Sequence, residues 1–91
     1  MTEATIELQI QNQKGLHARA AAAFVKCVGE YDADVTVSKN SQEVDGSSIL
    51  GLMMLGASKG SIIVVKANGN QANEVISALS DLVDSLFGEG M

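Results

Sequence analysis

The chain has 91 residues, 46% of them hydrophobic, which fits a single domain spanning residues 1–91 with a thin core and leaves little room for a deep substrate cleft. Eleven acidic against six basic side chains give a formal charge of −5, which opposes binding to nucleic acid and to anionic lipid. The first residues lack a signal-peptide pattern and no apolar run could span a bilayer, so a cytoplasmic protein without membrane insertion is expected.

The first half of the chain is predicted to form a strand, a helix and two further strands. Residues 5–10 alternate apolar and polar side chains, which is typical of a strand that buries one face. Residues 17–29 are rich in alanine and have apolar side chains at helical spacing, so a helix is expected that ends at Gly29 in the left-handed conformation. Residues 33–38 alternate again, and a polar turn then leads into a short strand over 42–44, so the two strands should pair as a hairpin.

The second half is predicted to form two helices separated by one strand. Either Ser47 or Ser48 can cap a short helix over residues 49–55. Residues 61–67 contain a β-branched run that suits a buried central strand, and residues 68–70 are expected to turn the chain.

The last element is the clearest in the sequence. Residues 71–86 place their apolar side chains on one stripe, which indicates an amphipathic helix. The element order β-α-β-β-α-β-α therefore predicts an α+β fold, a sandwich with the helices on one face of a mostly antiparallel sheet.

The only histidine and the only arginine lie two residues apart, in Gly15-Leu16-His17-Ala18-Arg19-Ala20, where the first helix should begin. Amides in a first helical turn lack intrahelical partners and the helix dipole favours negative charge there, so the backbone of Ala18 and Arg19 could bind a phosphate. The Arg19 guanidinium could donate to two phosphate oxygens, and His17 could act as the nucleophile that takes up a phosphoryl group. A histidine that only caps the helix or is only exposed would show the same local pattern.

Other kinds of chemistry have little support in the sequence. Cys27 is the only cysteine, so no intramolecular disulfide can form, and its helical position indicates an ordinary partly buried residue. There is no second histidine and no recognised ligand spacing, so neither a metal site nor a cofactor is expected. An enzyme with its own small-molecule substrate is disfavoured, because no paired carboxylates, nucleophile and base, or glycine-rich phosphate loop accompanies His17.

The short helix over residues 49–55 is apolar on nearly every side. If Leu52 and Leu55 pack inward, the other large apolar side chains of this helix cannot all be buried, and adaptable methionines are common at binding surfaces. A protein-docking patch is therefore predicted, with a more deeply buried helix as the alternative. The residues of the predicted patch are Ile49, Leu50, Met53 and Met54.

Together these motifs resemble the HPr family, the histidine-containing phosphocarriers of the bacterial phosphoenolpyruvate-dependent sugar phosphotransferase system. Gly15-Leu16-His17-Ala18-Arg19-Ala20 resembles the family's active-site motif, and Ser48-Ile49-Leu50-Gly51-Leu52-Met53-Met54-Leu55-Gly56 resembles its regulatory-serine helix. The resemblance implies an open-faced β-sandwich of four strands and three helices. It also implies that His17 accepts phosphate on Nδ1 from phosphorylated enzyme I and passes it to an enzyme IIA in sugar uptake, with Arg19 steadying the phosphoryl group.

Three features of the sequence bear on how far the resemblance extends. Ala20 stands where many members of the family have proline, although alanine is also found there. Ser47 occupies a place that is often basic, which leaves open whether a serine kinase or phosphorylase acts on this chain and whether Ser48 or Ser47 is its target. The nitrogen-related paralogues share both motifs, so the alternative is a nitrogen-related phosphotransfer or regulatory interaction protein that acts through the Ser48 helix.

Overall fold

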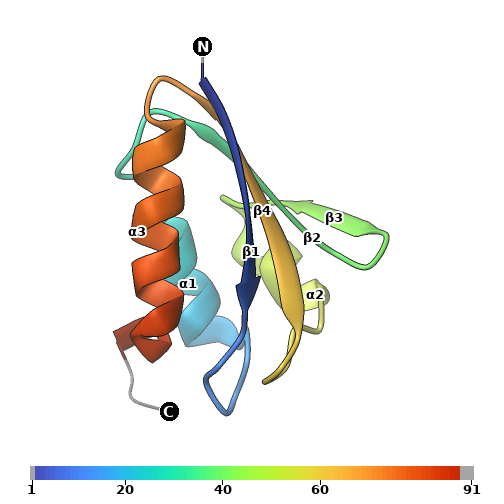
Figure 1. Ribbon diagram of the computed structural model, residues 1–91. Coiled ribbons are helices and arrows are strands. Elements are labelled where there is room, and N and C mark those ends of the chain that lie inside the picture. Colours follow the sequence, from blue (N-terminus) through green and yellow to red (C-terminus); the bar gives the residue numbers. More distant parts are fainter. Residues whose placement is uncertain (1, 89–91) are drawn as a thin grey trace.

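The computed structural model describes residues 2–88, which form a four-stranded antiparallel sheet with three α-helices (Figure 1). The elements are β1 (Thr2–Gln9), α1 (Ala18–Val28), β2 (Asp34–Lys39), β3 (Gln42–Asp45), α2 (Ile49–Met54), β4 (Ile62–Gly69), α3 (Ala72–Asp84) and the 3-10 turn η1 (Leu86–Gly88). This order and the open-faced α+β arrangement confirm the prediction from sequence. None of the helices within residues 2–88 has the length and apolar character needed to cross a bilayer.

Strand β4 lies at the centre of the sheet, whose spatial order is β1-β4-β2-β3. It pairs antiparallel with both β1 and β2, so that Val65 lies opposite Ile6 on one side and Val37 on the other. The β-branched run of β4 fits this place, because such side chains pack well between two neighbouring strands. The predicted central strand is therefore confirmed, and the pairing of β2 with β3 confirms the predicted hairpin.

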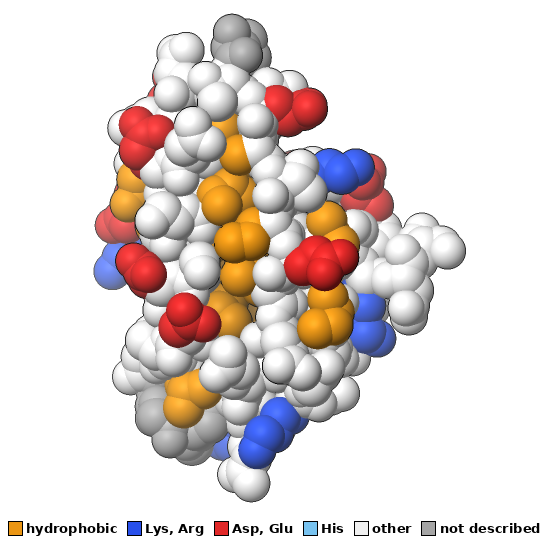
Figure 2. Space-filling model, in the orientation of Figure 1, with side chains coloured by type: hydrophobic (Ala, Val, Ile, Leu, Met, Phe, Trp, Pro, Cys, Tyr) orange, Lys and Arg blue, Asp and Glu red, His pale blue; other side chains and the backbone are white. Residues whose placement is uncertain are grey.

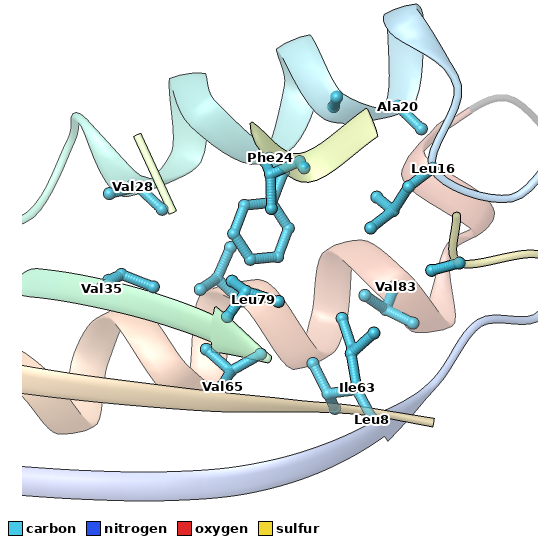
Figure 3. Packing of buried hydrophobic residues seen from close by; sticks show 14 of the residues in the cluster. Leu8, Leu16, Ala20, Phe24, Val28, Val35, Ile63, Val65, Leu79 and Val83 are labelled. Atoms are coloured by element: carbon cyan, nitrogen blue, oxygen red, sulfur yellow. The ribbon is translucent and has the colours of Figure 1, made fainter. Parts of the chain in front are cut away.

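The core lies between the sheet and the helices α1 and α3. Figure 3 shows Phe24 of α1 pointing toward Leu79 of α3, with Val65 of β4 below them, and all three side chains are fully buried. Alternate residues of β4 point away from this core, as its burial pattern shows, so the sandwich is open on its other face. Helix α2 packs against α1 and β3, toward the opposite edge of the sheet from β1.

Figure 2 shows where charge lies on one face of the molecule. A narrow column of hydrophobic side chains runs between α3 and β1, with acidic side chains on both sides of it. The column follows the line along which α3 packs on β1, where Ile6 and Ile76 are partly buried against the core. Much of the acidic character of the chain is visible on this face.

The end of β4 was predicted wrongly. Asn68 and Gly69 were expected to turn the chain, but they continue the strand and pair with Glu3 and Thr2 of β1. Strand β1 begins at Thr2, three residues earlier than predicted, and its first residues pair with the end of β4. This pairing keeps Asn68 and Gly69 in the strand, and the local sequence, which has the composition of a turn, does not reveal it.

Two helix ends also differ from the predictions. Gly29 was expected in the left-handed conformation but has φ −66° and ψ −12°, because α1 continues into a right-handed turn in which the Gly29 amide donates to Val25 O. Helix α3 ends at Asp84 rather than at 86. Leu86 and Phe87 both have φ 57°, and this bend brings the Phe87 side chain back into the core.

Candidate functional site

The loop before His17 is a tight turn closed by its own hydrogen bonds. The Gly15 amide donates to Asn12 O at 3.2 Å, and Asn12 Nδ2 donates to Gly15 O at 2.8 Å. Gly15 has φ +65°, and a Cβ at this position would overlap the carbonyl oxygen of Ala57. Only glycine fits both the backbone conformation and the close approach of the second chain segment.

His17 is the N-cap residue of α1. Its backbone is extended, with φ −76° and ψ 178°, and its carbonyl accepts the first helical hydrogen bond from Ala21 N at 2.8 Å. The imidazole does not cap the helix and is half-buried, while Ala18 and Arg19 are exposed. The first helical turn contains no acidic residue. An anion at this helix end therefore meets first-turn amides and the favourable end of the helix dipole.

The His17 loop and the end of α2 line one open depression of about 270 Å³. Leu16 is buried at this junction, and its amide donates to Ala57 O at 2.9 Å. The fold thus brings the two motifs singled out in the sequence onto one surface. The residues that line the depression are Lys14, Leu16, His17, Met53, Gly56, Ala57 and Ser58.

The charge near this depression is opposite to that of the whole chain. The segments 10–19 and 49–61, which build the site, contain Lys14, Arg19 and Lys59 but no Asp or Glu, although the chain has a formal charge of −5. Lys14 was not singled out from the sequence. Its place before Gly15 gave no signal, because only the fold shows that it shares a depression with His17. The local excess of positive charge suits a phosphoryl group or an acidic protein surface.

Helix α2 divides its apolar side chains between the core and the surface. Leu52 and Leu55 are buried, as predicted, and the alternative of a more deeply buried helix is wrong, because the other large apolar side chains of the helix are exposed. The four remaining large side chains form an exposed surface, called here the α2 patch. Its members and their exposed fractions are Ile49 (41%), Leu50 (68%), Met53 (41%) and Met54 (63%).

The two serines before α2 have different surroundings. Ser48 is the N-cap: its hydroxyl accepts a hydrogen bond from the Gly51 amide at 3.0 Å, and the residue is half-buried. Ser47 is exposed, and both its hydroxyl and its amide donate to Asp45 Oδ1, at 2.7 Å and 2.8 Å. These two hydrogen bonds hold the pKa of the Asp45 carboxyl below its usual value. The open choice of cap is thereby decided in favour of Ser48.

The remaining candidate groups give no sign of a reactive centre. Cys27 is a partly buried free thiol, and burial together with the nearby Glu30 raises its pKa, which lowers the thiolate fraction needed for reactivity. Within residues 2–88, no three His, Cys, Asp or Glu side chains gather in a way that could hold a metal ion.

Comparison with known proteins places these features in a family. Residues 4–85 match the family model "PTS HPr component phosphorylation site". The chain is 44% identical over 86 residues to phosphocarrier protein HPr of Pseudomonas aeruginosa, covering 93% of this chain and 96% of that one. It is 43% identical over 83 residues to phosphocarrier protein HPr of Neisseria meningitidis serogroup A, covering 91% and 93%. The crystal structure of HPr-C-His from Thermoanaerobacter tengcongensis superposes with a TM-score of 0.88 at 42% identity, covering 100% of both chains.

Proposed function

This chain belongs to the HPr family, whose members are phosphocarrier proteins of the bacterial phosphotransferase system rather than enzymes, and on this premise we propose that His17 carries the phosphoryl group. The observation that carries the proposal is the position of His17 as the N-cap of α1, with the amides of Ala18 and Arg19 following it at the same helix end. The depression beside His17 leaves the imidazole accessible to a second protein. Arg19 is exposed in the first helical turn, where a guanidinium can reach a bound phosphoryl group.

Phosphoryl transfer through this site is an exchange of one N–P bond for another. A neutral His17 imidazole attacks the phosphorus with the lone pair of Nδ1, and the bond from phosphorus to the donor's nitrogen breaks as the new bond forms. The electron pair of the broken bond stays with the donor. The helix amides and Arg19 stabilise the negative charge on the three phosphoryl oxygens during the exchange, and binding of the partner supplies the alignment.

We assign the chain to sugar uptake, with phosphorylated enzyme I as the donor and an enzyme IIA as the acceptor. The α2 patch lies beside the His17 depression, with Met53 belonging to both, so one apolar and locally basic surface can bind each partner in turn. The same surface supports the second candidate, a nitrogen-related or regulatory role in which the α2 patch and Ser48 govern binding. The two candidates differ in which donor protein charges His17.

The test is the intact mass of the protein after incubation with enzyme I, magnesium and phosphoenolpyruvate, before and after mild acid. One added phosphate that mild acid removes is expected for the wild type and for Ser48→Ala, which keeps the His17 site. His17→Ala should gain none. An acid-labile phosphate on His17→Ala would refute the assignment. No phosphate on the wild type from active enzyme I, but uptake from the nitrogen-related donor, would establish the second candidate.

A further inference from the structure

We propose that Asn12 is a positioning residue for phosphoryl transfer, whose side-chain amide fixes the turn that presents His17. The proposal rests on the proposed role of His17. Asn12 is completely buried and is the only buried polar residue within residues 2–88, whereas its neighbours Gln11 and Gln13 are exposed. A buried amide inside a short surface loop is therefore the unusual feature of this segment.

Asn12 forms hydrogen bonds with Gly15, which lies two residues before His17. Asn12 Nδ2 donates to Gly15 O, and the Gly15 amide donates back to Asn12 O, so two hydrogen bonds cross the turn at 2.8 Å and 3.2 Å. The next residue, Leu16, is buried and its amide donates to Ala57 O. His17 follows as the helix cap. The chain is thus fixed on both sides of Gly15, and the imidazole starts from a backbone position that these bonds define.

The energetic cost of Asn12 supports a role other than stability. Asn12 Oδ1 is buried and accepts no hydrogen bond within the described chain. Leaving such an acceptor unsatisfied is unfavourable in a protein interior, and an apolar side chain of similar volume would avoid this penalty. What an apolar side chain cannot replace is the bond from Nδ2 to the Gly15 carbonyl. That bond sets the orientation of the peptide group two residues before the nucleophile.

The experiment compares Asn12→Leu, which has similar volume and no donor, with the wild type and with Gln13→Leu, a matched change at the exposed neighbour. Each protein is charged by enzyme I over a range of protein concentrations and, separately, by phosphoramidate, a small donor that needs no docking surface. Thermal melting gives the stability of each variant. The NMR signals of the His17 imidazole report whether its surroundings have changed.

For Asn12→Leu we expect kcat with enzyme I to fall about tenfold or more with KM within about twofold of the wild type, because the nucleophile is misplaced while the docking surface is intact. The phosphoramidate rate should fall as well and the His17 NMR signals should shift. The melting temperature should fall only modestly, because loss of the bond to the Gly15 carbonyl is partly offset by removal of the unsatisfied Asn12 Oδ1. Gln13→Leu should behave as the wild type.

A wild-type kcat for Asn12→Leu, or a loss confined to KM, would overturn the proposal. If Asn12→Leu does not fold, Asn12→Ala replaces it, and failure of both to fold would show that Asn12 is structural. A wild type that takes no phosphate from either donor would instead refute the proposed function itself, so the two failures are distinguishable.

Discussion

Arg19 and His17 lie at the same helix end, yet their loss should have different effects. Arg19 is exposed, and interactions of exposed charged side chains contribute little to stability, so Arg19→Gln should change thermal melting only slightly. In the proposed mechanism its guanidinium donates to the phosphoryl oxygens, so loss of a charged hydrogen bond worth about 1.5–3 kcal/mol should slow transfer by roughly 10- to 100-fold. Rapid-quench measurement of phosphate uptake from enzyme I checks this. Lys26→Gln, in the last turn of the same helix, is the control. An unchanged rate for Arg19→Gln would remove Arg19 from the mechanism.

Ser48 combines a structural role with a place beside the α2 patch. Ser48→Ala removes the hydrogen bond to the Gly51 amide and should lower the free energy of unfolding by about 1 kcal/mol, whereas Ser48→Asp can still cap the helix. The added charge of Ser48→Asp should nevertheless raise KM for enzyme I, because it stands next to the apolar α2 patch, which is the proposed docking surface. Chemical denaturation and transfer kinetics separate the two effects. Equal KM values for the wild type and Ser48→Asp would argue against a regulatory role.

The Asp45 carboxyl gives a prediction for pH. The two hydrogen bonds from Ser47 lower the pKa of the Asp45 carboxyl in the folded state. These bonds therefore stabilise the fold fully at a pH above the pKa that Asp45 has in the unfolded chain. The stabilisation is lost as the pH falls through the pKa that Asp45 has in the folded protein. Ser47→Ala removes the hydroxyl bond and should raise the Asp45 pKa toward its ordinary value, as NMR titration of the carboxyl would show. A phosphate on Ser47 would face this carboxylate, which makes Ser48 the more favourable site for modification. An unmoved Asp45 pKa in Ser47→Ala would show that the hydroxyl is unimportant.

Helix α2 carries both exposed and fully buried large apolar side chains within six residues. Leu50 is exposed and Leu52 is fully buried, so a matched pair of substitutions distinguishes the two roles. Leu50→Ala should raise KM for enzyme I and leave melting nearly unchanged. Leu52→Ala should lower the free energy of unfolding by about 2–5 kcal/mol, because it leaves a cavity in the core. Titration calorimetry with the donor and chemical denaturation check the pair. Unchanged binding in Leu50→Ala would place the docking surface elsewhere.

At the level of elements, the sequence predicts which segments form strands and helices, because the periodicity of apolar residues differs between the two. The β-branched run of β4 and the apolar stripe of α3 both identify their elements, because each pattern records which face meets the core. Element ends depend on distant contacts instead. Gly69 stays in a strand because β1 pairs with it, and Phe87 turns inward because the core accepts its side chain.

In the candidate site, too, some residues can be identified from the local sequence and others only from the fold. His17 and Arg19 could be singled out because they are unique residues at a helix start. Asn12 and Lys14 could not, since only the fold shows that Asn12 is buried and that Lys14 shares a depression with His17 and the end of α2. The cap at Ser48 rather than Ser47 likewise depends on where the Asp45 carboxylate lies.

Over the whole molecule, a chain of formal charge −5 presents a site whose segments are free of carboxylates. Binding to an acidic partner surface should therefore weaken with salt, and KM for enzyme I should rise several-fold between low and physiological ionic strength while kcat changes little. Transfer kinetics at several salt concentrations check this, with Lys14→Gln expected to reduce the salt dependence and Lys39→Gln, on β2, expected to leave it unchanged. A KM independent of salt would contradict an electrostatic contribution.

The hydrogen bonds that join the His17 loop to residues 57–61 have a consequence for synthesis of the protein. Leu16 binds the carbonyl of Ala57, and Ile10 exchanges backbone hydrogen bonds with Gly60 and Ser61. A chain emerging from the ribosome has already exposed His17 long before these partners appear, and β1 has no neighbouring strand until β4 arrives. While residues 57–69 have not yet emerged, the nascent chain therefore lacks the contacts that fix the His17 loop. We expect such a chain to accept phosphate poorly, even though His17 is already exposed.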